Sequence, residues 1–147
     1  MRRAVPIDAA PIWAVHTRAI RGIASSHYDR DTIAAWSGRT TPASYLVPIE
    51  THAMSVAVGE DGRVLGFAEL DVEAGVVKAC YVDPEVARRG IGRALMREVE
   101  SIAREAGLRS LSLDASLNAV PFYEALGWRR GETARNRLPP GAKLDCV

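Results

Sequence analysis

Two arginines and two glycines lie a few residues after an apolar segment of the chain and form its most informative motif. The apolar run Val76–Val82 has the length and composition of a buried strand, and Asp83-Pro84 ends it. Arg88-Arg89-Gly90-Ile91-Gly92 then opens a long amphipathic helix. The first N–H groups of a helix have no partner within it, and the helix dipole places partial positive charge there. Glycine has no Cβ, so a phosphate can approach this backbone closely, and the motif predicts a binding site for a phosphate ester.

Two common phosphate-binding motifs are excluded by the residues around this turn. A P-loop needs Gly-x-x-x-x-Gly-Lys-Ser/Thr, and the chain contains no Gly-Lys pair. The dinucleotide fingerprint needs a third glycine three residues after Gly92, and that position holds Leu95. The turn is therefore of another kind, or else the two glycines merely form a tight connection between a strand and a helix.

The segments on either side of the turn give it a family likeness. Residues 87–95 read Ala-Arg-Arg-Gly-Ile-Gly-Arg-Ala-Leu, with Tyr-Val-Asp-Pro upstream at 81–84 and Pro-Phe-Tyr-Glu-Ala-Leu-Gly-Trp downstream at 121–128. Together they resemble the GNAT superfamily of acyl-CoA-dependent N-acyltransferases, over about residues 64–128. The family's turn reads Gln/Arg-x-x-Gly-x-Gly/Ala, and this chain departs from it with Ala87 at the Gln/Arg position. Since the family holds the cofactor pyrophosphate mostly through backbone N–H groups, the resemblance still implies binding of acetyl-CoA.

The resemblance also implies where the rest of the cofactor lies. In the family, the parallel strands that correspond to Val76–Val82 and Leu108–Ala115 splay apart, and the pantetheine arm lies between them. One backbone N–H near Tyr81 or Val82 would polarise the thioester carbonyl. The family's asparagine contact to pantetheine falls on Ser116, with Asn118 two residues later, and the sequence leaves the choice between them open. The cofactor-binding residues expected from the resemblance are Cys80, Tyr81, Val82, Arg88, Arg89, Gly90, Ile91, Gly92, Arg93, Ser116, Asn118 and Tyr123.

Tyr123 is the side chain expected to act as general acid. It matches the tyrosine of the family motif Phe/Leu-Tyr-Glu-x-x-Gly-Phe, which reads Phe-Tyr-Glu-Ala-Leu-Gly-Trp at 122–128. When an amine attacks the thioester, the sulfur of CoA leaves as a thiolate, and a tyrosine hydroxyl with a reference pKa of about 10 can protonate it. The alternative is a core tyrosine whose hydroxyl is bonded to the backbone.

The general base is less well specified by the sequence. An alkylammonium with a pKa of about 10.4 must lose a proton before it attacks, so a carboxylate, a histidine or a chain of waters is needed. The acidic residue that some family members carry in the fifth strand falls on Leu111 here. Glu69 is the first candidate for the base and for a contact with the acceptor, followed by Asp114 and His27. Residues of these types more often have a solvated or structural role.

Three aromatic or imidazole side chains suggest where the acceptor amine binds. His27, Tyr28 and Trp36 fall between and within the first two predicted helices, a region that forms one wall of the acceptor site in GNAT folds. Core packing explains Trp36 as well as substrate contact does. The sequence does not identify the acceptor.

Hydrophobic periodicity and turn residues predict the elements that position these residues. The expected strands are 2–5, 54–58, 64–70, 76–82, 108–115, 128–132 and 143–147, and the expected helices are 9–21, 31–36, 91–106 and 119–126. A further helical turn starts at Thr41 and is expected to stop at Pro48. We interpret the chain as one α/β domain over residues 1–147, of layered α+β type. It combines about four helices with a mixed, mostly antiparallel, GNAT-like sheet of six or seven strands, whose central parallel pair is splayed.

Composition agrees with a globular protein. The chain has 147 residues, of which 48% are hydrophobic and 25% charged, and a formal net charge of +1, which gives no support to nucleic-acid binding. No apolar run approaches the ~20 residues that span a bilayer, so we expect no membrane association. Cys80 and Cys146 have no metal-ligand spacing, nor do the histidines, so a reduced cytoplasmic protein without a metal is expected. The oligomeric state is left open, a homodimer included.

Taken together, these features predict an N-acetyltransferase that moves an acetyl group from acetyl-CoA directly to a primary amine. Two alternatives stay open from the sequence. One is a CoA-binding sensor or regulatory module that keeps the turn but transfers nothing. The other is a transferase for a bulkier acyl-CoA.

Overall fold

The computed structural model describes residues 1–23, 29–131 and 141–146, without the side chains of residues 23, 36, 37 and 141–146. Within these residues a seven-stranded sheet has the order β1-β2-β3-β4-β5-β7-β6. The strands are β1 (Arg2–Arg3), β2 (Ala53–Val58), β3 (Val64–Asp71), β4 (Val76–Val82), β5 (Leu111–Ser116), β6 (Arg129–Arg130) and β7 (Gly141–Cys146). All neighbours are antiparallel except β4 and β5, so the expected mixed sheet with one parallel pair is confirmed.

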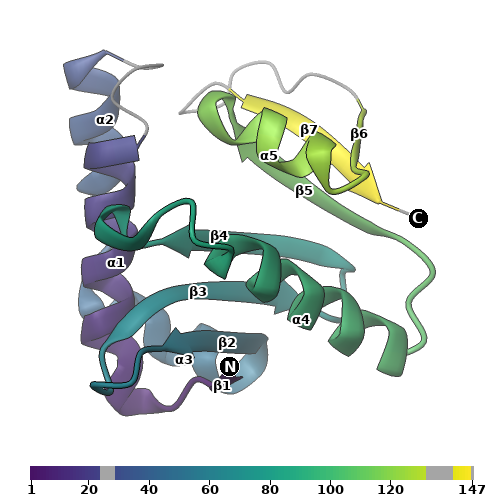
Figure 1. Cartoon of the computed structure of the whole chain (residues 1–147), viewed down its shortest axis with the longest axis horizontal. Coiled ribbons are helices and arrows are strands. Elements are labelled where there is room, and N and C mark those ends of the chain that lie inside the picture. Colours follow the sequence, from purple (N-terminus) through teal and green to yellow (C-terminus); the bar gives the residue numbers. More distant parts are fainter. Residues whose placement is uncertain (24–28, 132–140, 147) are drawn as a thin grey trace.

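The helices cover both faces of this sheet (Figure 1). They are α1 (Ala9–Ile23), α2 (Arg30–Ser37), α3 (Leu46–Thr51), α4 (Ile91–Glu105) and α5 (Val120–Ala125), with short 3₁₀ turns η1 (Pro6–Asp8), η3 (Pro42–Tyr45), η4 (Pro84–Val86) and η5 (Leu117–Ala119). In the part of the chain that is described, none of them combines the length and the apolar composition that a bilayer crossing requires.

Two hydrophobic cores follow from the alternation of side chains along the strands. Ala68 and Leu70 of β3 pack in one core with Leu95 and Val99 of α4, and this core extends to β5 and α5. Phe67, which precedes Ala68 and faces the opposite side of β3, packs in the second core with residues of α1, β2 and α3. Both faces of the central strands are therefore buried, which fixes their register.

The parallel pair β4–β5 is paired over a short stretch only. Its register joins Val76 with Ser112 and Val77 with Leu113, although β4 continues to Val82 and β5 to Ser116. The carboxyl-terminal halves of the two strands therefore diverge, as Figure 1 shows, and the expected splay is confirmed. Lys78 sits where they part, as an extra residue of β4 at a register shift against β3.

Several predicted boundaries differ from the structure, among them the first strand, which ends at Arg3 and not at Val5, and two of the differences have clear local reasons. Pro48 does not stop the helical turn that begins after Thr41, because it lies in the first turn of α3, where its missing N–H removes no helical hydrogen bond. The strand expected from Leu108 begins only at Leu111. The Leu108 N–H instead donates to Ala103 O at 3.0 Å and closes the end of α4, where Gly107 has φ of 80°.

Candidate active site

A cavity of about 380 Å³ lies where β4 and β5 diverge. Its walls come from α1, β4, the turn between β4 and α4, β5, η5 and α5, so it joins nearly every predicted site segment. Ala19 and Ile20 of α1 line it, as do Lys78 at the bulge and Asp114 on β5. Sequence reasoning did not single out Ala19, Ile20 or Lys78, because a helix wall and a bulge depend on pairing that no local pattern reveals.

The turn at the start of α4 forms one end of the cavity. Gly90 is the residue before the helix, has φ of 84°, and no side chain caps the helix there. The first helical hydrogen bond runs from the Ala94 N–H to Gly90 O, so the preceding N–H groups have no helical partner. Arg88 also has positive φ, at 64°, which is rare for a residue other than glycine and is typical of functional turns. This geometry suits the anion predicted from the sequence.

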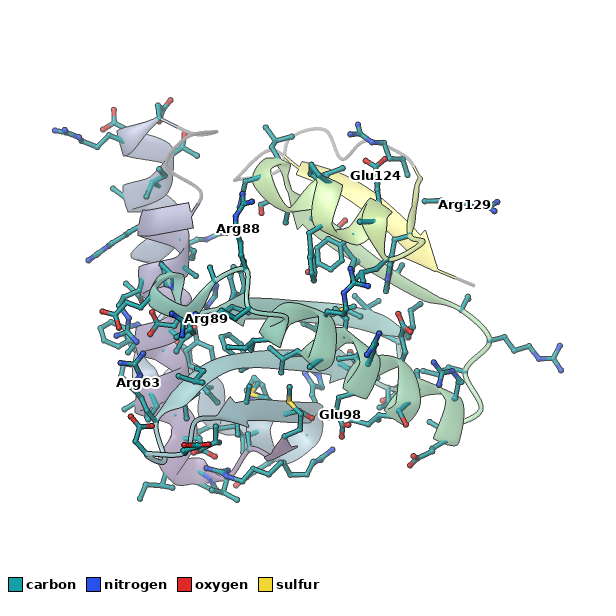
Figure 2. All side chains as sticks on the ribbon, in the orientation of Figure 1. Arg63, Arg88, Arg89, Glu98, Glu124 and Arg129 are labelled. Carbon is teal, nitrogen blue, oxygen red and sulfur yellow. The ribbon has the colours of Figure 1, made fainter. Side chains whose placement is uncertain are left out.

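The three arginines of the turn are exposed but differ in their placement. Arg88 and Arg93 line the cavity, whereas Arg89 does not. Figure 2 shows the side chain of Arg88 extending from the turn in the direction of α5. Gly92 lines the cavity as well, and a Cβ at this position would come within 3.2 Å of the Phe122 ring. Glycine at position 92 therefore also permits close packing of α4 against α5.

The divergence of the strands exposes backbone groups of β4 to the cavity. The Asp83 N–H donates to Leu65 O on the β3 side at 2.8 Å. Because successive residues of a strand present their backbone groups to opposite sides, those of Tyr81 point to β3, and those of Cys80 and Val82 point into the split. Of the two N–H groups considered from sequence for the thioester carbonyl, the one of Val82 is thus the better placed.

A buried oxygen atom without a hydrogen-bond partner favours Asn118 over Ser116 for the pantetheine contact expected from the sequence. Both residues line the cavity. The side-chain carbonyl Oδ1 of Asn118 is buried and has no hydrogen-bond partner among the described residues. A buried acceptor without a partner is unfavourable, so an amide N–H of a ligand in this cavity would satisfy it. Asn118 therefore fits a contact with pantetheine, whose amides supply such groups.

Tyr123 is buried at 6% exposure and its hydroxyl lies in the cavity wall against Cys80. Burial raises the pKa of Tyr123 well above its usual value, and the nearby Cys80 and Tyr81 act in the same direction. The apolar surroundings likewise raise the pKa of the Cys80 thiol to about 12. Both groups are therefore protonated at neutral pH, and the hydroxyl of Tyr123 lies close enough to the sulfur of Cys80 for the two groups to influence each other's pKa. An acid that already contacts a sulfur atom suits protonation of a thiolate.

The two carboxylates considered for the base occupy different places. Asp114 is exposed and lines the cavity. Glu69 is buried at 8% exposure and is not among the lining residues. Its Oε1 lies 2.6 Å from Nδ1 of His52, whose Nε2 is 3.6 Å from Asp71. The structure therefore brings Asp114 to the cavity and couples Glu69 to a histidine outside it.

The acceptor residues expected from sequence are only partly described. His27 and Tyr28 lie outside the described residues, so their expected contacts stay predictions, as does the role of His27 as a base. Trp36 belongs to α2, but its side chain lies outside the described part. In the described ranges, no group of three or more histidine, cysteine or acidic side chains is placed to hold a metal ion.

His16 is a half-buried residue beside Tyr81 of the cavity wall, and the sequence did not identify it as part of the site. Its ring packs on Tyr81 with centroids 4.2 Å apart, and its Nδ1 is hydrogen-bonded to the Tyr45 hydroxyl. The other ring nitrogen, Nε2, is buried and without a hydrogen-bond partner in the described residues. Burial lowers the pKa of His16 to about 4, so this ring is neutral at pH 7 and anchors α1 to β4.

This lowered pKa predicts a loss of stability in mild acid. Between about pH 6.5 and 4 the unfolded chain protonates His16 and the folded chain does not, so the free energy of unfolding falls as the pH falls through that window. The contribution is about 3 kcal/mol over the window. We expect His16→Phe, which keeps an aromatic ring in the cluster, to reduce this dependence. Urea unfolding of both proteins at pH 7 and 4.5 measures it, and equal pH dependence would contradict the prediction.

Comparisons with known proteins agree with this geometry. A family model described as an acetyltransferase (GNAT) domain matches residues 24–137. The uncharacterized N-acetyltransferase YafP of Escherichia coli is 28% identical over 129 residues, which cover 88% of this chain and 80% of YafP. An aminoglycoside N(6')-acetyltransferase type 1 of Stenotrophomonas maltophilia is 31% identical over 139 residues, covering 85% of this chain and 80% of that protein. The crystal structure of PaiA N-acetyltransferase from Thermoplasma acidophilum, in complex with coenzyme A, superimposes with a TM-score of 0.84 at 20% identity and covers 98% of this chain and 95% of that one.

Proposed function

Since the chain belongs to the GNAT superfamily of acetyltransferases, and is by that membership an acyltransferase, we propose that it transfers an acetyl group from acetyl-CoA directly to a primary amine. The observation that carries the proposal is that one cavity is lined both by Tyr123, whose buried hydroxyl is protonated, and by Gly90 at the uncapped N-terminus of α4. The coenzyme A bound by the similar PaiA structure supports the choice of co-substrate.

The residues have the following roles in this proposal. The N–H groups at the start of α4 bind the pyrophosphate, and Oδ1 of Asn118 accepts from a pantetheine amide. The N–H of Val82 polarises the thioester carbonyl while the amine attacks its carbon. As the C–N bond forms and the C–S bond breaks, Tyr123 gives its proton to the departing sulfur. Before the attack, the acceptor ammonium gives one proton to a carboxylate, and the second proton that leaves the nitrogen as the amide forms restores the Tyr123 hydroxyl.

Asp114 and Glu69 are the two candidates for that carboxylate, and their amide variants separate them. We expect Asp114→Asn to lower kcat/KM about tenfold at pH 7, because Asp114 lines the cavity. The loss should shrink as the pH approaches the pKa of the acceptor, where the amine arrives already neutral. Glu69→Gln should give a pH–rate profile parallel to that of the unchanged protein, because Glu69 is bonded to His52 outside the lining residues.

A parallel profile for Asp114→Asn, together with a pH-dependent loss in Glu69→Gln, would assign the role of base to Glu69, acting through His52 or through water. Parallel profiles for both variants would exclude both carboxylates as the general base and leave His27 or a chain of waters as the candidates. An increase of KM with unchanged kcat in Asp114→Asn would indicate that Asp114 only attracts the cationic acceptor.

The proposed activity is tested by an amine-acceptor screen with acetyl-CoA that follows release of free thiol. The panel should contain a lysine peptide, a peptide with a free N-terminus, a polyamine, an aminoglycoside and an amino sugar. Release with at least one acceptor, lost when acetyl-CoA is replaced by a non-hydrolysable thioether, supports transfer. Binding of CoA without release in any reaction would favour the sensor. Release only with propionyl-CoA or longer thioesters would favour the bulkier acyl donor.

A further inference from the structure

A buried ion pair joins α1 to the end of β4. The guanidinium NH2 of Arg18 lies 2.6 Å from Oδ2 of Asp83. Asp83 is 1% exposed and is one of the most deeply buried charged residues described, while the side chain of Arg18 is half-exposed. A buried carboxylate needs such a partner, because removing an ion from water is unfavourable unless it is paired and hydrogen-bonded.

Asp83 also organises the chain that leads to the phosphate turn. Its Oδ1 accepts a hydrogen bond from the Glu85 N–H at 3.1 Å and caps η4, and its own N–H donates to Leu65 O. Burial opposes ionisation of this carboxyl, but the Glu85 N–H and the Arg18 guanidinium outweigh it and hold its pKa below the usual value. The carboxylate is therefore charged at neutral pH, and both of its oxygens have partners: Oδ1 accepts from the Glu85 N–H and Oδ2 is paired with Arg18.

The two segments joined by this pair both contribute residues to the wall of the same cavity. The residues after Arg18 on α1, Ala19 and Ile20, line it, and so do Arg88 and Gly90 of the turn that follows η4. α1 and η4 also pack closely, since a Cβ on Gly22 would come within 3.2 Å of Pro84. Figure 1 shows α1 passing beside the end of β4 and the connection to α4.

We propose that Arg18 and Asp83 are positioning residues, which hold the phosphate turn against the α1 wall and thereby set the affinity for CoA. This inference rests on the proposed function and adds to it the pair that keeps the cofactor site in its binding geometry. Neither residue needs to touch the cofactor. The pair limits the turn to the arrangement in which its N–H groups and the α1 wall face the same cavity.

A second ion pair of this chain provides a matched control. Arg2 and Asp8 lie 2.7 Å apart, with side-chain exposures of 45% and 5% against 50% and 1% for Arg18 and Asp83. Asp8 likewise accepts a backbone N–H, from Val5 at 2.8 Å. This pair lies before α1, and neither of its residues lines the cavity. If Arg18 and Asp83 only stabilised the fold, disrupting either pair would have the same effect on the affinity for CoA.

The test compares Asp83→Asn with Asp8→Asn by urea unfolding and by calorimetric titration with CoA. We expect both variants to lose stability, and only Asp83→Asn to bind CoA about tenfold more weakly. If Asp83→Asn does not fold, Arg18→Gln replaces it, because the side chain at position 18 is half-exposed, glutamine still offers an N–H donor to Asp83, and the bond from the Glu85 N–H to Asp83 stays in place. Arg18→Lys keeps the charge and should retain most of the affinity.

The outcomes separate this inference from the proposed function. Failure of the unchanged protein to bind CoA would overturn both. Binding by the unchanged protein that Asp83→Asn and Arg18→Gln both retain would overturn the role of the pair alone. An equal loss of affinity in Asp8→Asn would also overturn it, because a general loss of stability would then explain the effect.

Discussion

Replacing Tyr123 by phenylalanine is expected to lower kcat by about 10²–10⁴-fold, the usual contribution of a general acid, while the affinity for acetyl-CoA stays nearly unchanged. The hydroxyl is the only group removed, and the ring keeps its packing against Phe122 and Trp128 at centroid distances of 5.0 and 6.0 Å. Steady-state kinetics with one good acceptor, together with calorimetric titration of acetyl-CoA, measure the two effects separately.

Tyr45 provides the control for the loss of a buried hydroxyl. It is 5% exposed, against 6% for Tyr123, and its hydroxyl is hydrogen-bonded to His16 in the second core rather than in the cavity wall. We expect Tyr45→Phe to reduce stability but to keep kcat. A change of less than threefold in Tyr123→Phe, with chemistry rate-limiting, would assign Tyr123 a structural role. An equal fall in both variants would point to a general effect of core hydroxyls.

The parts of the site that could be predicted from sequence are those fixed by neighbours in the chain. The strand, Asp83-Pro84, the glycines and the helix from Ile91 follow one another directly, so local rules locate the phosphate turn. The helix connection between β4 and β5 likewise favours parallel strands, which the structure confirms. Tyr123 was found through a contiguous motif, and the structure places it in the cavity wall.

The parts that could not be predicted depend on contacts between distant segments. The bond between Glu69 and His52 joins two strand ends through side chains, and nothing in either local pattern distinguishes it from a free carboxylate. The choice of Asn118 rests on an unpaired oxygen, which only three-dimensional packing reveals. The Arg18–Asp83 pair spans 65 positions of the chain, so its burial follows from the fold and not from spacing.

The phosphate turn gives the second large effect, through the conformation of Gly90. Its φ of 84° is one that a β-branched residue adopts only with strain, so Gly90→Val should shift the turn to another conformation. Restoring the binding conformation costs about 1–3 kcal/mol, which corresponds to roughly a 5- to 150-fold loss of affinity for CoA. The valine side chain itself meets no atom, since nothing lies within 4 Å of a Cβ at this position. Calorimetric titration with CoA measures the loss.

Gly62 is the matched control for this change. It has φ of 82°, and nothing lies within 4 Å of a Cβ there either, but it belongs to the turn between β2 and β3 and does not line the cavity. Gly62→Val should therefore lose a similar amount of stability in urea unfolding and keep its affinity for CoA. Equal affinities in the two variants would mean that the turn at Gly90 is a strand–helix connection without a part in binding. The cofactor would then have to be held by β4 and α5 alone, and the anion site inferred from the two glycines would be wrong.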